Sequence, residues 1–125
     1  MVTKIPLGPG GTPYSQGIKS GGGSHTIFIS GQLAKVDPAA GKVPDLGAQA
    51  REIFTNMQAL LKEAGGSLAD VVKITTFVTT LEGYAEYGAI RREFFSEPYP
   101  ASSTVQVSAL VVPGCVIEIE AVALI

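Results

Sequence analysis

The chain ends with Cys115-Val116-Ile117-Glu118-Ile119-Glu120-Ala121-Val122-Ala123-Leu124-Ile125, a run of mainly β-branched and apolar residues. This composition favours a strand over a helix. Because the side chains of a strand point alternately to opposite faces, the odd-numbered positions form one wholly apolar face. The even-numbered positions form a second face, on which Glu118 and Glu120 lie about 6.5 Å apart among apolar residues.

The mixture of acidic and apolar residues on this second face has two interpretations. In the first, the apolar face packs on helices, and another subunit partly covers the second face, leaving a cleft in which a carboxylate can act. In the other, Glu118 and Glu120 are rim charges on a half-exposed strand. The periodicity alone leaves both interpretations open.

Length and composition indicate one domain, spanning residues 1–125. Charged residues make up only 16% of the chain, and the mean hydropathy is +0.30. A domain this small cannot enclose so much apolar surface, so we expect part of that surface to face a partner.

Composition also disfavours several classes of protein. No apolar run reaches the ~18 residues of a membrane span, and the N-terminus lacks the pattern of a signal peptide. The single cysteine excludes an internal disulfide and predicts a reducing, cytoplasmic environment. The net charge is −2, and the adjacent basic pair Arg91-Arg92 is expected on a solvated helix face, so nucleic acid is a disfavoured partner.

Periodicity and turn residues predict an α+β fold. The expected strands cover residues 1–7, 14–18, 25–30, 71–79, 102–107 and 115–125. The first expected helix follows Asp45, its expected N-cap, and ends at Gly65-Gly66, and the second covers 81–95. The second and third strands are expected to pair as a hairpin. The order of the elements predicts a single mixed β-sheet with both helices packed on one face.

A glycine follows the third predicted strand in Ser30-Gly31-Gln32. A glycine can bring the backbone close to a ligand. It is equally typical of a β-bulge, and the sequence does not decide between the two.

The reactive side chains restrict the possible chemistry. His25 is the one histidine and lies beside a predicted turn, which disfavours histidine-dependent nucleophilic catalysis. No spacing of His and Cys suits zinc, and the glycine-rich stretches lack the lysine of a phosphate-binding loop. We therefore expect no metal and no cofactor, and any catalysis to rest on a carboxylate, a tyrosine, hydroxyls and backbone groups. Such groups suit acid–base help to a reactive substrate.

Four stretches, in this order and at this spacing, together resemble the YjgF/YER057c/UK114 (Rid) family, whose members are also called L-PSP endoribonuclease-like proteins. They are Pro13-Tyr14-Ser15-Gln16, Ser30-Gly31-Gln32, the run from Gly65 to Val78, and Glu118-Ile119-Glu120-Ala121. The resemblance covers nearly the whole chain. It implies the chorismate-mutase-like α+β fold and a homotrimer, with the uncovered sheet faces inside and clefts between the subunits.

The resemblance also implies an activity and a set of site residues. Members of the deaminase branch hydrolyse reactive enamines and imines. By resemblance, Glu118 and Tyr14 are the expected catalytic residues. Glu118 would hold or activate the attacking water, and Tyr14 would line the cleft with Ser30 and Gly31, around a small-molecule substrate.

The segment that carries the substrate-binding arginine of that branch departs from the family's pattern. In this chain Ser102 stands at the arginine position, Thr104 stands at the position of a cysteine, and Gly88 stands where such members have an asparagine. Serine has neither the charge nor the reach of a guanidinium. Ser102, Thr104 and Gly88 are thus the expected substrate-binding positions of a site with altered specificity.

Three functions follow from these observations. The first is a deaminase-like hydrolase of an imine, an enamine or a related small metabolite. The second is a trimeric small-molecule-binding or regulatory protein that does not deaminate. The third is a ribonuclease or translation inhibitor, which the absence of a basic surface stripe disfavours.

Overall fold

The computed structural model describes residues 3–15 and 17–125, so Gln16 of the first motif and the first two residues of the predicted strand 1–7 lie outside the described residues. The observed elements follow the predicted order. They are β1 (Thr3–Leu7), β2 (Gly17–Gly21), β3 (Thr26–Gln32), the 3-10 helix η1 (Pro38–Ala40), α1 (Leu46–Glu63), the 3-10 helix η2 (Leu68–Asp70), β4 (Val71–Val78), α2 (Tyr84–Phe94), β5 (Ala101–Gln106) and β6 (Ile117–Leu124).

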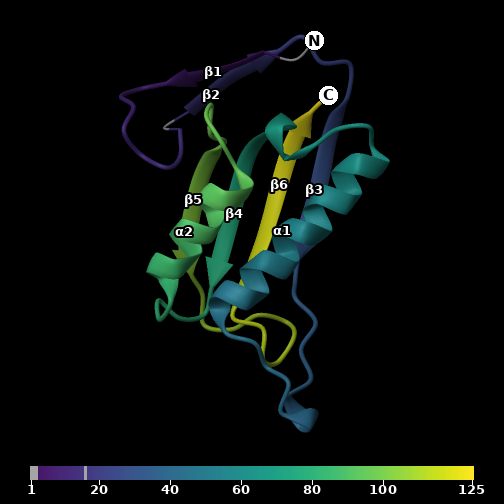
Figure 1. Cartoon of the computed structure of the whole chain (residues 1–125), viewed down its shortest axis with the longest axis vertical. Coiled ribbons are helices and arrows are strands. Elements are labelled where there is room, and N and C mark those ends of the chain that lie inside the picture. The colour runs from purple at the N-terminus through teal and green to yellow at the C-terminus, as the bar shows by residue number, and fades with distance from the viewer. Residues whose placement is uncertain (1–2, 16) are drawn as a thin grey trace.

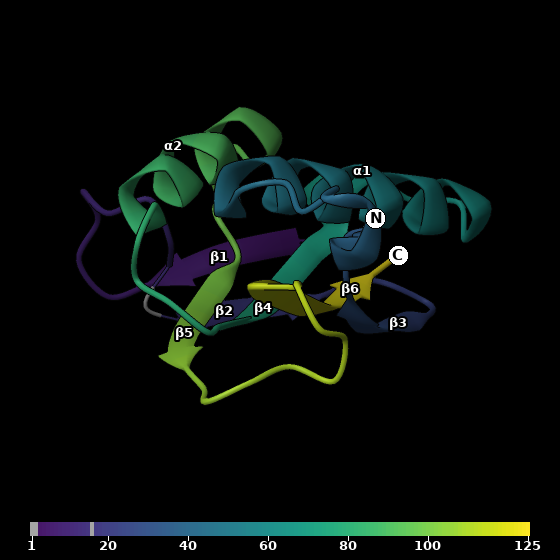
Figure 2. The same ribbon diagram turned by 90° about the horizontal axis from the view of Figure 1, so that it is seen from below.

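β6 lies inside a four-stranded mixed sheet of order β3-β6-β4-β5. It is antiparallel to both β3 and β4, and β4 is parallel to β5. Both helices cover one face of this sheet and leave the other face open (Figures 1 and 2). The α+β architecture predicted from the order of the elements, two helices on one face of a mixed sheet, is therefore confirmed.

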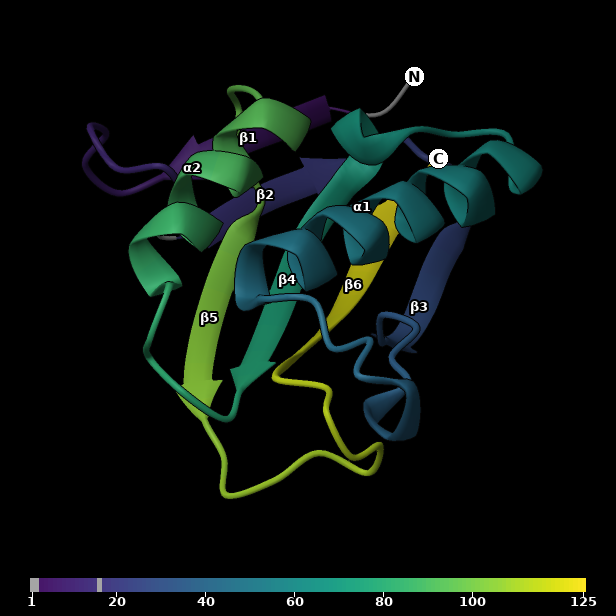
Figure 3. The ribbon, with the colours of Figure 1, turned by 60° about the horizontal axis from the view of Figure 1, so that its bottom comes forward.

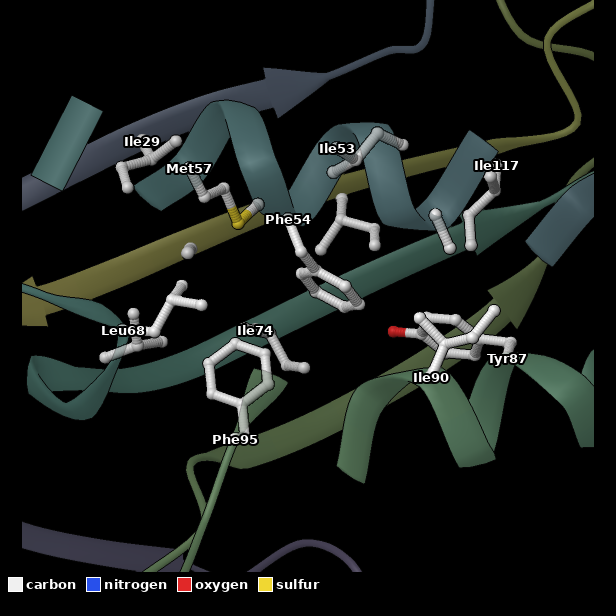
Figure 4. Close-up of a cluster of buried hydrophobic side chains, with 14 of the residues drawn as sticks. Ile29, Ile53, Phe54, Met57, Leu68, Ile74, Tyr87, Ile90, Phe95 and Ile117 are labelled. Atoms are coloured by element: carbon white, nitrogen blue, oxygen red, sulfur yellow. The ribbon is translucent and has the colours of Figure 1, made fainter. Parts of the chain in front are cut away.

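The core fills the space between the two helices and the sheet (Figure 4). Phe54 of α1 is at its centre, with its ring centroid 5.2 Å from that of Phe94 and 5.3 Å from that of Phe95. Burying each large apolar side chain of this kind contributes roughly 1.5–3 kcal/mol. As predicted, Asp45 caps α1, because its side chain accepts a hydrogen bond of 2.9 Å from the amide of Ala48.

The alternation predicted for β6 is also confirmed. Its odd-numbered residues 117–123 are buried against the helices, whereas Glu118 is half-buried and Glu120 is exposed on the opposite face. That open face carries apolar side chains as well: Phe28 of β3 is 78% exposed and Val105 of β5 is 46% exposed. The chain thus leaves apolar surface on one side of its sheet.

The predicted hairpin between residues 14–18 and 25–30 is wrong. β2 instead pairs antiparallel with β1, and these two strands form a separate two-stranded sheet at one end of the molecule (Figure 3). β3 pairs with β6, where Ile27 lies opposite Ala123 and Ile29 opposite Ala121. The apolar face of β3 therefore finds its match beside the buried face of β6, and burial decides the pairing rather than closeness in the sequence.

Within the described part of the chain, no helix combines the length and the apolar character needed to cross a membrane.

Candidate functional site

Gly31 and Glu118, two of the predicted site residues, are in close contact. A Cβ built on Gly31 would lie 2.7 Å from Cδ and 3.0 Å from Cγ of Glu118. The pairing of β3 with β6 shifts register between Ile29 and Gln32, which places a bulge at this point. The bulge interpretation of the glycine is therefore confirmed, whereas an approach of the backbone to a ligand stays a prediction. The structure adds that the missing side chain of Gly31 makes room for the carboxylate of Glu118.

Cys115 lies near the same carboxylate, just before β6. Burial, followed by the negative charges of Glu52 and Glu118, raises the pKa of the Cys115 thiol above its ordinary value. The Cys115 Sγ also donates a hydrogen bond of 3.4 Å to the carbonyl oxygen of Ala34. The raised pKa disfavours the thiolate, which is the form of a cysteine that acts as a nucleophile.

Ser30 precedes the glycine and belongs to the same bulge. Its side chain is exposed, and its carbonyl oxygen accepts a hydrogen bond of 2.9 Å from Nε2 of Gln32. Ser30, Gly31 and Glu118 together form what we call the acidic half-site, on β3 and β6.

Ser102 and Thr104 lie on β5, at the other end of the sheet. In the parallel register Ser102 pairs with Ile74 and Thr104 pairs with Thr76, two residues whose side chains are buried beneath the helices. Ser102 and Thr104 therefore face α2. Gly88 of α2 is partly exposed, and a Cβ built on it would meet no atom within 4 Å, so open space lies beside it.

Arg91 of α2 lies beside these residues. The prediction that it lies on a solvated face of the helix is therefore wrong. It is only 7% exposed, whereas its neighbour Arg92 is exposed. Arg91 follows the buried Tyr87 by four positions, so it lies on the same face of the helix. Its Nη1 donates a hydrogen bond of 3.4 Å to Oγ of Ser102, and its Cζ lies 5.3 Å from the ring centroid of Tyr87.

The basic half-site is our name for Gly88, Arg91, Ser102 and Thr104. Reasoning from the sequence found three of these residues through the resemblance and missed Arg91. The helical spacing from Tyr84 through Tyr87 to Arg91 was the signal that could have found it.

Tyr14 lies close to the start of β5. The next residue, Ser15, forms a bridge with Ala101, and its hydroxyl donates a hydrogen bond to the carbonyl oxygen of Tyr99. Tyr14 and Ser15 line an open groove of about 500 Å³. The other residues lining the groove are Pro6 to Thr12 and Glu97 to Tyr99. Glu118 is not among them.

One chain does not bring the two half-sites together. Glu118 pairs with Phe77 and lies on the open face of the sheet, whereas Ser102 pairs with the buried Ile74 and faces the helices. In addition, β4 separates β6 from β5. A single copy therefore holds the acidic and basic groups on opposite faces of its sheet.

No metal centre is evident in the described residues. Among residues 3–15 and 17–125, no group of three or more His, Cys, Asp or Glu side chains is arranged to hold a metal ion.

Comparison with known proteins gives sequence matches over most of the chain. The family model described as Endoribonuclease L-PSP matches residues 9–125. A RutC family protein of Pyrococcus abyssi is 40% identical over 113 residues, which cover 89% of this chain and 85% of the relative. The 2-iminobutanoate/2-iminopropanoate deaminase of Escherichia coli K12 is 42% identical over 116 residues, covering 89% of this chain and 86% of that enzyme.

Solved structures agree with this match. The Rid family protein YyfB of Yersinia pestis, whose function is unknown, superposes with a TM-score of 0.81 at 29% identity and covers 98% of both chains. RidA of an Antarctic Psychrobacter has a TM-score of 0.70 at 41% identity, covering 98% of this chain and 94% of that protein. The sequence match over nearly the full length and the shared fold show that this chain belongs to the Rid (YjgF/YER057c/UK114) family.

Proposed function

We propose that this protein hydrolyses a reactive imine or enamine of a small metabolite, in clefts formed between the copies of a homotrimer. The observation that carries the proposal is the position of Glu118. Its carboxylate is held against the backbone of Gly31 on the open face of the sheet, where a neighbouring copy can approach. The name of the Escherichia coli relative supports the class of reaction, since that protein is a 2-iminobutanoate/2-iminopropanoate deaminase.

A trimer would bring the acidic half-site of one copy together with the basic half-site of another. The open face carries Phe28 and Val105 beside Glu118, which gives a second copy an apolar surface to bury. A copy packed there could bring its basic half-site and its Tyr14 to the edge of the first copy's acidic half-site. The complete site would then be shared, with each copy contributing one half to each of two clefts.

The chemistry suits the groups available. As water attacks the carbon of the C=N bond, Glu118 accepts a proton from it, and the nitrogen becomes protonated to give a carbinolamine. The hydroxyl proton of the carbinolamine then passes to its nitrogen as the C–N bond breaks, which releases ammonia and leaves the carbonyl product. No electrons leave or enter the substrate, so the reaction needs no oxidant and no redox cofactor.

Substrate choice is expected to differ from that of relatives that have an arginine on β5. Ser102 cannot make the paired hydrogen bonds of a guanidinium to a carboxylate. A substrate with a different shape, or one anchored by another residue, fits this site better.

The serine in place of an arginine at position 102 also supports a second candidate function. Without an arginine on β5, the protein could bind a small molecule between its subunits without deaminating it. A ribonuclease, which the name of the family model suggests, has less support, because the chain has a net charge of −2.

One experiment separates hydrolysis from binding alone. An amino-acid oxidase generates 2-iminopropanoate in the presence of semicarbazide, which traps the imine before it hydrolyses. The trap and hydrolysis each release one ammonia, but only hydrolysis gives free pyruvate. An active protein competes with the trap, so semicarbazone formation slows and free pyruvate appears earlier. Wild type should show this competition, and Glu118→Gln, which keeps the size of the side chain, should lose it. Equal traces for wild type and the variant would reject hydrolysis through Glu118, and a wild-type trace equal to that of the reaction without protein would favour a binding protein.

A further inference from the structure

Arg91 is a buried cation without a carboxylate partner. It is 7% exposed, and among the described residues the one salt bridge joins Arg51 to Glu93, on the solvent side of the helices. The charged group of Arg91 lies 5.3 Å from the centroid of the Tyr87 ring and 3.4 Å from the Ser102 hydroxyl, and its charge also acts on the phenol of Tyr87. No carboxylate of residues 3–15 and 17–125 therefore pairs with this positive charge.

The guanidinium also has an unused donor. Nε of Arg91 is buried and has no hydrogen-bond partner in the part of the chain that the structure describes. A buried N–H without an acceptor is costly, and a buried charge without a counterion is more so. Such a group is stable only if the rest of the fold holds it in place or if a ligand supplies the missing acceptor.

The surroundings of Arg91 leave room for such a ligand. Gly88 precedes Arg91 by three positions and so lies beside it on the helix. A Cβ on Gly88 would meet nothing within 4 Å. The hydroxyls of Ser102 and Thr104, which face α2 from β5, add groups that can donate hydrogen bonds to an anion.

We propose that Gly88, Arg91 and Ser102 form an anion subsite that holds the carboxylate of a 2-imino or 2-oxo acid, with the charge supplied by α2 instead of β5. This inference rests on the proposed function, because it assigns the substrate class of the same cleft. A planar carboxylate matches the fork of a guanidinium and would accept hydrogen bonds from Nε and from a terminal nitrogen of Arg91. The serine at position 102 then leaves space for Arg91, and its hydroxyl donates a hydrogen bond to the same carboxylate.

Binding can be measured apart from catalysis with a matched pair of probes. Pyruvate carries the carboxylate, and pyruvamide is its neutral analogue of nearly the same shape. Isothermal titration at low salt should show pyruvate binding to wild type and binding at least tenfold weaker for pyruvamide. Arg91→Gln should weaken pyruvate binding by roughly 10- to 100-fold, the cost of losing hydrogen bonds to a charged donor, and should leave pyruvamide unchanged.

The chain offers two controls. Arg92→Gln removes an equal charge from the next residue, which is exposed, and should leave pyruvate affinity within about twofold, as expected for a screened surface charge. Glu118→Gln should lose hydrolysis and keep pyruvate binding. If wild type binds pyruvate but hydrolyses no imine, the proposed function fails and the anion subsite stands. If it hydrolyses imines and Arg91→Gln binds pyruvate as wild type does, the subsite fails alone.

A second measurement covers the case in which Arg91→Gln does not fold. The Nε–H resonance of Arg91 in a ¹⁵N spectrum of the wild-type protein should shift on addition of pyruvate and should not shift with pyruvamide. An Nε–H resonance that is insensitive to pyruvate would overturn the inference. Dissociation of the oligomer by Arg91→Gln, in a wild type that does not bind pyruvate, would overturn it as well, because Arg91 would then pair with a neighbouring copy.

Discussion

The carboxylate of Glu118 lies where a side chain on Gly31 would have to be. A Cβ at position 31 would come within 2.7 Å of Cδ of Glu118, closer than unbonded carbon atoms approach. The bulge in β3 and the absence of a side chain at its centre thus determine where the acid of β6 is held. This contact makes Gly31 a positioning residue for Glu118.

Gly31→Ala is therefore expected to impair activity more than stability. The Glu118 side chain can rotate away from the new methyl group, so the free energy of unfolding should fall by less than about 1.5 kcal/mol. Imine hydrolysis should fall by roughly 100-fold, as is typical when a catalytic group is displaced by about 1 Å. Gly21→Ala is the control, because a Cβ there meets nothing within 4 Å. Normal kcat in Gly31→Ala, with the fold intact, would contradict this role.

The pH at which the Cys115 thiol becomes reactive should depend on the charge of Glu118. Burial and the charges of Glu52 and Glu118 raise its pKa, so the reactive thiolate forms at higher pH than in an ordinary cysteine, whose pKa is about 8.5. The rate of reaction with Ellman's reagent should stay low at pH 8 and rise only at higher pH. In Glu118→Gln the pH–rate curve should move toward lower pH, because one of the two negative charges is gone. An unmoved curve would place Glu118 away from Cys115.

Phe28 should be required for assembly. It is 78% exposed on the open face and pairs with Val122 of β6. Phe28→Asp places a charge on a surface that a trimer would bury, so light scattering should show dissociation to monomers. Val111, an apolar residue of the β5–β6 loop that is 88% exposed, gives the control Val111→Asp, which should remain trimeric. A monomeric wild type would contradict the shared cleft.

Moving the charge from α2 back to β5 should restore binding. The double variant Arg91→Gln/Ser102→Arg again holds one guanidinium in the basic half-site, and its pyruvate affinity should return to within about tenfold of wild type. Ser102→Arg alone places two cations at contact distance and should unfold at a lower temperature than the double variant, because like charges repel. Equal affinities of the double variant and Arg91→Gln would show that position 102 does not face the bound anion.

The sequence was sufficient for those elements whose side chains alternate or recur regularly. The alternation of β6 predicted which face is buried, and Asp45 predicted the start of α1, because each depends on local chemistry. The partner of β3 was not predictable in this way, because Ile27 and Ile29 match residues of β6 that are far away in the sequence. A nearby strand was assumed instead, and that assumption was wrong.

The site was predictable only in part. Glu118 and Gly31 were identified through the family resemblance, and their contact depends on a bulge that a single sequence does not reveal. Arg91 was assigned to solvent because adjacent basic residues on a helix usually face water. Its burial depends on α2 packing Tyr87 and Arg91 over β5, which is a tertiary relationship.

The shared cleft is tested most directly by mixing two impaired variants. Glu118→Gln lacks the acid, Arg91→Gln lacks the anion anchor, and each alone is expected to lose most of its activity at a low substrate concentration. If one copy supplies the acid and its neighbour the arginine, co-refolding equal amounts should restore roughly a quarter of the wild-type activity, since one in four randomly formed clefts is complete in a cyclic trimer. Mixed oligomers that remain inactive would contradict a site shared between copies.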